Sequence, residues 1–407
     1  MTRFALFFGA LIPFVFLSGC QFLYPDSEPE VRTAEDLSFD GSYYGQNAKE
    51  YFQGGHYAKA KDQWVRQLAK EPDNWMAKLG VASCDYYMGS LSIDLGDIRG
   101  GRDNLQSAEA AVRELWDGTI EADTFEVRSE PVRQWQAAFI LSITHRALGD
   151  CDHMEALMAT QRLATIDLRD RRRDKLAKHR MKLEKQSESN YSASLALLAK
   201  LVKMKHASEE AYLNYAELLA RSGDNEQAEK HFLSYLEVAR TSLDKHLADR
   251  KALLEAPGEA SKRAFTAELW DKKIQSNTQK QVGVLVRLGN IHYDDAHSEA
   301  ERSNGPRMTA DQRLRARNIS KVHYTKSLDY LRQAQVLQPE KLDLLVKMAQ
   351  CEGELGFYES AILNVEQFIS KSAQDGQAPD ESIHRAYRLK ADLEKKYKAR
   401  KERLPGK

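Results

Sequence analysis

Residues 132–256 contain no proline and only two glycines, Gly149 and Gly223. Proline breaks a helix and glycine lowers its stability, so a stretch of this length without them favours long helices. The whole chain holds only 10 prolines and 22 glycines in 407 residues. β-Sandwiches, barrels and disulfide-rich loop folds need frequent turn residues, and this composition disfavours them. No stretch shows a sustained alternation of apolar and polar residues, so we predict an all-α fold.

The charge balance argues against one common class of function. The chain has 60 basic and 60 acidic side chains and no formal net charge, whereas nucleic-acid binders usually carry a basic excess. The charges are nevertheless unevenly distributed. Residues 26–40 hold six acids and one base, residues 169–185 hold nine bases and three acids, and residues 385–407 hold ten bases and three acids. A partner would meet these local charges rather than the neutral average.

The first twenty residues have the pattern of an export signal. A positive charge at Arg3 precedes an apolar run from Phe4 to Phe16, which is shorter than the about 20 residues of a membrane-spanning helix. Small residues and Cys20 follow this run. A short membrane anchor and a buried helix are the alternatives, but a buried helix does not explain the ending Leu17-Ser18-Gly19-Cys20.

That ending resembles the lipobox of bacterial lipoproteins. The resemblance implies a signal peptide of residues 1–19, acylation of Cys20 and anchoring to a membrane. Several acyl chains give stable anchoring, because each buried CH₂ contributes about 0.8 kcal/mol. Gln21 in place of Asp resembles the sorting signal for the outer membrane, which implies a protein of the bacterial cell envelope that faces the periplasm. Residues 20–42 contain two prolines and many acids, and we expect them to form a flexible acidic tether.

Three glycines share one pattern of spaced residues. A small residue lies seven positions before each glycine, an alanine lies five positions after it, and a large apolar residue lies nine positions after it. The three sets are Ala48, Gly55, Ala60 and Trp64; Ala216, Gly223, Ala228 and Phe232; and Ala349, Gly356, Ala361 and Val365. Glycine suits the end of a helix because it adopts the left-handed conformation without a Cβ clash. Each set therefore predicts two antiparallel helices joined at the glycine.

These sets resemble the tetratricopeptide repeat (TPR), whose signature places Leu-Gly in the first helix, Ala-x-x-x-Phe in the second and Pro at the end. Leu79-Gly80 and Leu288-Gly289 match the first part, and Pro72 and Pro339 match the last. Gly149 fits the pattern only in part, and we expect a turn there too. The resemblance implies an irregular TPR-like α-solenoid of five to seven hairpins over residues 43–375. Its small residues would let helices approach, while Trp64, Phe232 and Val365 would pack towards neighbouring repeats.

Four segments depart from the repeat length. We expect a long basic helical excursion at about 160–190, because residues 169–175 contain no apolar side chain and a helix that is polar all round cannot be packed. We expect a tall hairpin at about 226–293 and an insertion at about 294–318. Residues 376–407 should form a capping helix and a basic tail.

The basic excursion is the sharpest candidate for a binding surface. Its side chains either are solvated and stabilised by nearby acids, or contact an acidic protein, anionic lipid headgroups or a cell-wall polymer. In the solenoid groove, we expect solvent-facing residues on first helices, such as Asn214 and Glu217, to meet a partner. The candidate residues for contact with an anionic partner are Arg169, Arg171, Arg172, Arg173 and Lys175.

No catalytic signature occurs in the sequence. H-E-x-x-H, G-x-S-x-G, the Walker A loop and G-x-G-x-x-G are absent, and Ser242 and Lys245 have the S-x-x-K spacing without its companion motifs. We therefore expect no enzymatic activity, no cofactor and no small-molecule substrate.

Cysteines and histidines give no metal-binding signature either. Cys84, Cys151 and Cys351 form no C-x-x-C pair, and we expect buried thiols on helices, with one internal disulfide as the alternative. Cys151 starts a short cluster with Asp152 and His153 that lacks a fourth ligand. We expect no metal there, and none at four histidines without a partner at ligand spacing: His56, His231, His292 and His323.

The lipobox and the repeats together resemble envelope adaptors of the BamD/ComL and NlpI types and the pilotins of type IV pili. The resemblance implies a lipid-anchored scaffold that binds envelope proteins through its groove. Export argues against nucleic acid as a partner. The alternatives are a component of an outer-membrane assembly or secretion complex, and a subunit that recognises peptidoglycan or another anionic glycan through the basic excursion.

Overall fold

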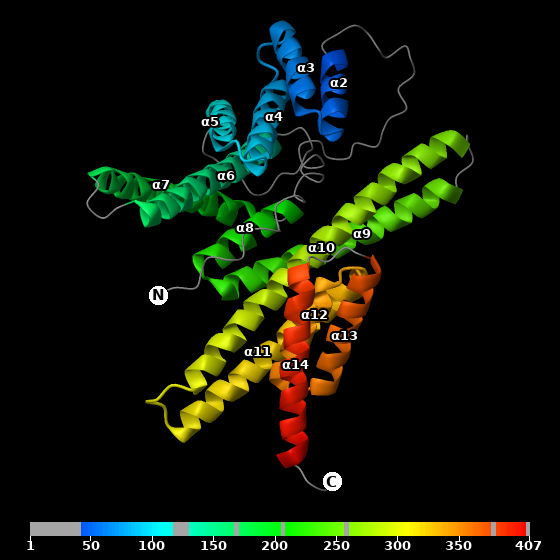
Figure 1. The fold of residues 1–407 in the computed structure, drawn as a ribbon. Helices are drawn as coiled ribbons and strands as arrows, with labels where there is room; N and C mark the ends of the chain where they lie inside the picture. Colours follow the sequence, from blue (N-terminus) through cyan, green and yellow to red (C-terminus); the bar gives the residue numbers. More distant parts are fainter. Residues whose placement is uncertain are drawn as a thin grey trace. The chain divides into compact units, whose positions relative to one another are not determined.

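A computed structural model describes residues 42–116, 130–166, 171–204, 208–255, 260–375 and 380–403. Within these ranges the chain forms thirteen α-helices and no β-strand (Figure 1). The predicted all-α fold is confirmed. Backbone contacts divide the chain into two compact units, residues 1–231 and 232–407, and each is described by itself. Cys20, the signal peptide and residues 20–41 of the tether lie outside the described residues.

Unit 1 is a series of helical hairpins. They are α2 (Ser42–Gln53) with α3 (Tyr57–Lys70), α4 (Trp75–Asp94) with α5 (Ile98–Leu115), α6 (Glu130–Thr165) with α7 (Arg171–Leu201), and α8 (Glu209–Ser222) with the start of α9 (Asn225–Glu255). Each of the first three hairpins packs on the next element, because α3 contacts α4, α5 contacts α6 and α7 contacts α8. Hairpins stacked in chain order form a TPR-like α-solenoid.

Unit 2 follows the same principle with longer helices. It contains most of α9, then α10 (Ala260–Ser303), α11 (Ala310–Leu337), α12 (Asp343–Leu355), α13 (Tyr358–Asp375) and α14 (Asp380–Arg403). The first part of α10 pairs with α9, where Arg250 Nε lies 2.5 Å from Asp271 Oδ1, and α10 also packs along α11. Helix α11 contacts α12, and α13 contacts α14.

Glycine turns join the helices at Gly55, Gly223 and Gly356, as predicted. Their φ angles of +76°, +85° and +84° lie in the left-handed region, which favours glycine. The alanines seven positions before and five positions after each turn have no exposed surface. Trp64, Phe232 and Val365 are at most 1% exposed. The spacing pattern therefore marks buried helix contacts on both sides of each turn.

Gly96 makes a fourth turn of this kind, between α4 and α5, with φ of +88°. Its flanking positions hold Gly89 and Gly101 where the other sets have alanine, and Leu105 in the large apolar position. A Cβ at Gly101 would lie 2.8 Å from the carbonyl oxygen of Gly89. The two helices thus approach too closely for alanine at these two positions. The spacing pattern predicts this hairpin only if glycine is allowed in place of the two alanines.

Contacts between consecutive hairpins use the remaining repeat residues. A Cβ at Gly80 in α4 would lie 2.5 Å from ring atoms of Trp64 in α3, so the tryptophan packs directly on the next hairpin. Pro72 lies in the turn between these helices, and Pro339 lies in the turn between α11 and α12. Gly289 lies inside α10, where its carbonyl oxygen accepts a hydrogen bond from Ser327 Oγ at 2.7 Å.

The expected turn at Gly149 is wrong, because this glycine lies inside α6. A Cβ at Gly149 would lie 2.7 Å from a ring atom of Tyr191 in α7. The glycine therefore permits a close helix crossing and does not end a helix. A glycine among amphipathic residues serves either purpose, and the sequence around Gly149 does not distinguish them.

The extra length after Gly289 extends two helices. Helix α10 continues to Ser303, and α11 starts at Ala310 after a turn that contains Asn304-Gly305-Pro306. A capping box fixes this start, because Gln312 N donates to Thr309 Oγ1 at 3.2 Å and Thr309 N donates to Gln312 Oε1 at 2.9 Å. Residues 294–318 therefore lie mainly in the ends of these two helices.

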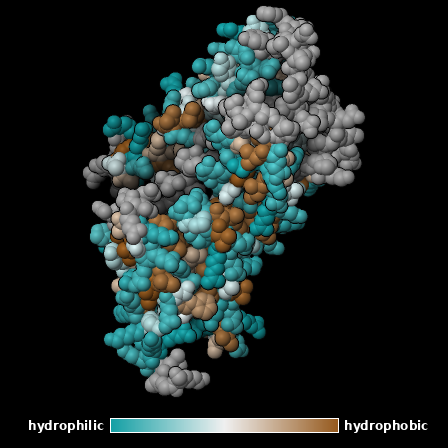
Figure 2. All heavy atoms as spheres, turned by 90° about the vertical axis from the view of Figure 1, so that its right-hand side faces the viewer, coloured by the Kyte–Doolittle hydropathy of each residue, from teal (hydrophilic) through white to brown (hydrophobic). Residues whose placement is uncertain are grey.

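No helix in the described ranges is long and apolar enough to cross a membrane. On the face that Figure 2 shows, hydrophobic residues form separate patches among hydrophilic ones.

We predict opposite effects for two glycine-to-alanine substitutions. Gly80→Ala should lower the free energy of unfolding by roughly 1–3 kcal/mol, because the new methyl group collides with the Trp64 ring. Gly283→Ala, inside α10 and with no atom of another helix within 4 Å of the added Cβ, should raise it by roughly 0.5–1 kcal/mol. Chemical denaturation followed by circular dichroism measures both. Equal effects would contradict the close contact at Gly80.

Candidate functional site

The hairpin of α6 and α7 is longer than the neighbouring hairpins of unit 1. Its helices have 36 and 31 residues, and in Figure 1 its end extends past α5. Two hydrogen bonds fix the register of the helices: Ser187 Oγ donates to Gly149 O at 2.9 Å, and Ser194 Oγ donates to Ser142 O at 2.7 Å. These short side chains require a close approach of the two helices, so the hairpin is tightly packed where it joins the solenoid.

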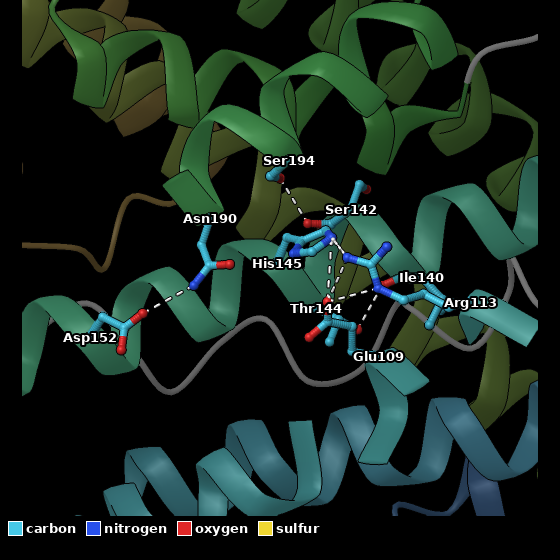
Figure 3. A network of polar contacts seen from close by, with 9 residues as sticks. All are labelled: Glu109, Arg113, Ile140, Ser142, Thr144, His145, Asp152, Asn190 and Ser194. Carbon is cyan, nitrogen blue, oxygen red and sulfur yellow. Dashed lines mark hydrogen bonds and ion pairs between the residues drawn. The ribbon is translucent and has the colours of Figure 1, made fainter. Parts of the chain in front are cut away.

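A buried carboxylate ties this hairpin to α5. Asp152 of α6 is 2% exposed and accepts hydrogen bonds from Arg102 Nη1 of α5 at 2.6 Å and from Asn190 Nδ2 of α7 at 3.0 Å. Figure 3 shows the pair of Asp152 and Asn190 beside the rest of the polar network. A buried charge is tolerated only when it is paired and hydrogen-bonded. Asp152 therefore holds three helices in one arrangement.

His145 forms the second part of the network in Figure 3. Its Nε2 lies 3.4 Å from Arg113 Nη2 and 3.9 Å from Glu109 Oε1, both on α5. Burial lowers the pKa of His145, and the charge of Arg113 lowers it further, although Glu109 opposes the shift. The imidazole is therefore neutral at pH 7.

The hydroxyl groups of this network are engaged with the backbone. Ser142 Oγ donates to Phe139 O and Thr144 Oγ1 donates to Ile140 O, both at 2.7 Å, and Ser194 bonds to α6 as described above. A nucleophilic hydroxyl has to donate its proton to a base. With their protons directed at carbonyl oxygens, these three hydroxyl groups are not activated as nucleophiles.

The network continues to α8, and this corrects the expected groove residues. Asn214 Oδ1 accepts a hydrogen bond from Arg146 Nη1 of α6 at 2.6 Å, and Glu217 forms an ion pair with the same guanidinium group. Both residues are half-buried. They hold α8 on α6, so their polar groups are already engaged within the solenoid. This contact could not be predicted from local sequence, because Arg146 lies 68 residues before Asn214.

Beyond Asp152, the hairpin carries a surface that we call the tip surface. It combines exposed bases on α7 with exposed apolar side chains on both helices, of which Leu157 is 43%, Met158 46% and Met181 61% exposed. The contact of Ser187 with Gly149 sets an antiparallel register, which places Met181 near the level of Leu157 and Met158. The bases of the tip surface are Lys175, Lys178, Lys182 and Lys185.

The arginines predicted to contact an anionic partner have different environments. Arg169 and the side chain of Arg171 lie outside the described residues. Arg172 and Lys175 are exposed. Arg173 is half-buried, and its Nη1 donates to Ile166 O at 3.1 Å. Because it satisfies a carbonyl group at the end of α6, Arg173 serves the hairpin itself.

Cys84, Cys151 and Cys351 are buried thiols on helices, which confirms the prediction. Burial raises the pKa of Cys151 to about 12 and that of Cys351 to about 11. Neither thiol is therefore a nucleophile or a thiolate ligand at neutral pH.

The expectation that the histidines have no partner at ligand spacing is wrong for two of them. The hairpin of α10 and α11 brings His292 and His323 together, with their Nδ1 atoms 3.0 Å apart. Asp295 lies beside them. The sequence carries a partial signal, a His-x-x-Asp spacing on α10. The third residue lies on the next helix, and only the hairpin register reveals it.

No protein-family model and no curated protein matches the chain. Among solved structures, the chain is similar to the Assembly Chaperone of RpL4 (Acl4), with 12% identity over 80% of this chain and 99% of that chain and a TM-score of 0.36. It is also similar to the TPR2AB-domain:pHSP90-complex of yeast Sti1, with 10% identity over 87% of this chain and 98% of that chain and a TM-score of 0.21. Yeast Tom70 gives 11% identity, coverage of 88% and 90%, and a TM-score of 0.17. Because these TM-scores are low, the similarities support no conclusion about this chain. Its description as a TPR-like solenoid rests on the stacked helical hairpins described above.

We predict that the buried pair of Arg102 and Asp152 stabilises unit 1. Arg102→Met should lower the free energy of unfolding by about 3–5 kcal/mol, because Asp152 would remain buried without its cation. Arg113→Ala, which removes a cation that is 56% exposed, should cost less than about 1 kcal/mol. Denaturant unfolding of the variants measures both. A small effect of Arg102→Met would mean that Asn190 alone suffices to hold the carboxylate.

Proposed function

We propose that this protein is a lipid-anchored, TPR-like scaffold of the bacterial cell envelope that binds an acidic protein partner through the tip surface. The observation that carries the proposal is that Leu157, Met158 and Met181 are exposed on a hairpin whose second helix, α7, also carries four exposed lysines. A purely solvated basic helix needs no exposed apolar side chains. Protein interfaces, in contrast, are enriched in methionine and surround an apolar centre with charged groups.

The packing below the tip surface supports a binding role. The tip surface stands on a hairpin that Asp152 and His145 link to α5, and Arg146 links to α8. A surface held in one position loses less entropy when it binds. The charge of its lysines would attract an acidic partner and orient it during the encounter.

The membrane part of the proposal rests on the lipobox at Cys20. An acyl anchor followed by an acidic tether would place the solenoid near the outer membrane without a spanning helix. The resemblance to envelope adaptors also underlies two finer proposals, a role in outer-membrane protein assembly and a role in secretin assembly. The arrangement of the polar network supports a scaffold rather than an enzyme, because its hydroxyl groups are directed at carbonyl oxygens.

Recognition of peptidoglycan or another anionic glycan is the second candidate. The exposed lysines of the tip surface favour it, since a repeating anionic polymer is bound mainly through charge. It differs from the first candidate in one property. Binding of a glycan would not depend on Met181, whereas an acidic protein would bury this side chain.

We predict that Cys20→Ser abolishes anchoring. The variant should keep its signal peptide, incorporate no acyl chain and leave the outer-membrane fraction, because it has no thiol to acylate. Incorporation of labelled palmitate and sedimentation of membranes measure the change. Cys351→Ser is the control, and its thiol is buried on α12, so it should remain in the membrane fraction. Unchanged processing and membrane partition of Cys20→Ser would refute the lipoprotein assignment.

We predict that the positive charge of the α7 lysines strengthens the binding of a protein partner to the tip surface. A photo-reactive amino acid at position 181 should crosslink to an envelope protein in cells. Combining it with Lys178→Glu, Lys182→Glu and Lys185→Glu should reduce the yield about ten-fold, because three charges at roughly 0.5 kcal/mol each amount to one decade in affinity.

The matched control reverses three exposed bases on α14: Arg385, Lys395 and Lys398. It should leave the crosslink unchanged. A crosslink that survives reversal on α7 would contradict a charge-dependent contact. If instead Met181→Ala has no effect while the charge reversals release the protein from purified cell-wall sacculi, the glycan candidate replaces the acidic protein.

A further inference from the structure

The hairpin of α10 and α11 contains a cluster of metal-ligating atoms far from the tip surface in sequence. His292 and Asp295 lie on α10, and His323 lies on α11. The Nδ1 atoms of the two histidines are 3.0 Å apart, and Asp295 Oδ2 is 3.9 Å from His323 Nδ1. One ligand atom from each of the three residues lies within 4.8 Å of the other two.

The backbone fixes these positions. His292 and Asp295 are three residues apart, so they share one face of α10. The hydrogen bond from Ser327 Oγ to Gly289 O lies about one turn away from both histidines, and Leu331 would be 3.0 Å from a Cβ at Gly289. This tight contact sets the register of the two helices. It therefore holds the imidazole of His323 opposite that of His292.

The surroundings suit a ligand set. The ring of His292 is buried and stacks on Tyr330, with centroids 5.7 Å apart and an interplanar angle of 5°. Such packing fixes the ring orientation, as metal sites require. The side chains of His323 and Asp295 are 27% and 36% exposed. An ion can thus enter from solvent on one side while the other side is closed by the helix contact.

The chemistry of the three groups selects the ion. Two imidazole nitrogens at 3.0 Å can share only one proton, and a cation between them would use both lone pairs. Ligands of tetrahedral zinc, with Zn–N distances of about 2.0–2.1 Å, are about 3.3 Å apart. Small side-chain rotations would bring the three atoms to this geometry. Two imidazoles and one carboxylate are typical ligands of Zn²⁺ and related divalent transition metals.

We propose that His292, Asp295 and His323 form a site for a divalent transition-metal ion, with zinc as the best match. Three protein ligands leave a fourth position for water. Since the ligands come from both helices, the ion would fasten α10 to the middle of α11. The site is independent of the proposed binding function, because it uses no residue of the tip surface.

Isothermal titration of the full chain with ZnCl₂, purified without a histidine tag, tests the proposal. We expect one Zn²⁺ per chain, and Co²⁺ should produce the visible d–d bands of a site with nitrogen and oxygen ligands. His323→Ala should weaken zinc binding at least about 100-fold, and Asp295→Asn at least about ten-fold, since even outer contacts of a metal site change affinity by about 10–100-fold. Zinc should also raise the melting temperature of the wild type and not of His323→Ala.

His297→Ala is the matched control. This histidine lies on the same helix, is 59% exposed and pairs with Glu301, and its removal should leave zinc affinity and stoichiometry unchanged. Asp295→Asn keeps the shape of its side chain, so circular dichroism should show an intact fold. Zinc binding by the wild type no tighter than by His323→Ala would overturn the proposal. So would an equal loss in His297→Ala, because it would place the metal elsewhere.

Discussion

At Gly80, Gly149 and Gly353, two helices approach so closely that an added Cβ would lie 2.5–2.7 Å from a side chain of the neighbouring helix. Helices with larger residues at these positions would have to separate, and the apolar faces beside them would lose contact. This close approach therefore determines the spacing and the register of the hairpins. Polar groups beside these contacts depend on it, as Asp152 depends on the crossing at Gly149, and the pair of His292 and His323 depends on a similar approach at Gly289.

Buried carboxylates make this arrangement specific. Apolar faces can pack in several registers at similar cost, whereas a buried carboxylate is stabilised only where its partners are aligned. Asp152 is one example, and α4 and α12 provide two more. Asp85 accepts from Lys61 Nζ at 2.5 Å and from Ser107 Oγ at 3.0 Å. Glu352 accepts from Ser360 Oγ and Asn364 Nδ2, both at 2.8 Å.

Local signals predicted the hairpins, and contacts between distant residues escaped prediction. The turns at Gly55, Gly223 and Gly356 follow from spacings within 17 residues. The prediction of a turn at Gly149 was wrong because a glycine permits either a turn or a close helix crossing, and the local sequence does not distinguish the two. The pairing of Arg146 with Asn214 spans 68 residues and that of His292 with His323 spans 31. Both depend on a register that only packed helices define, and Cys20 remains a prediction.

The length of the α6–α7 hairpin turns a small difference in angle at its base into a large displacement at its far end. From Asp152 to Thr165 the helix covers 13 residues, or about 20 Å at 1.5 Å per residue. A difference of about 10° in the direction of the hairpin at the buried carboxylate would displace the far end by about 3–4 Å, whereas groups beside Asp152 would hardly move. The alignment of Arg102 and Asn190 on this carboxylate therefore sets where the far end of the hairpin lies on unit 1.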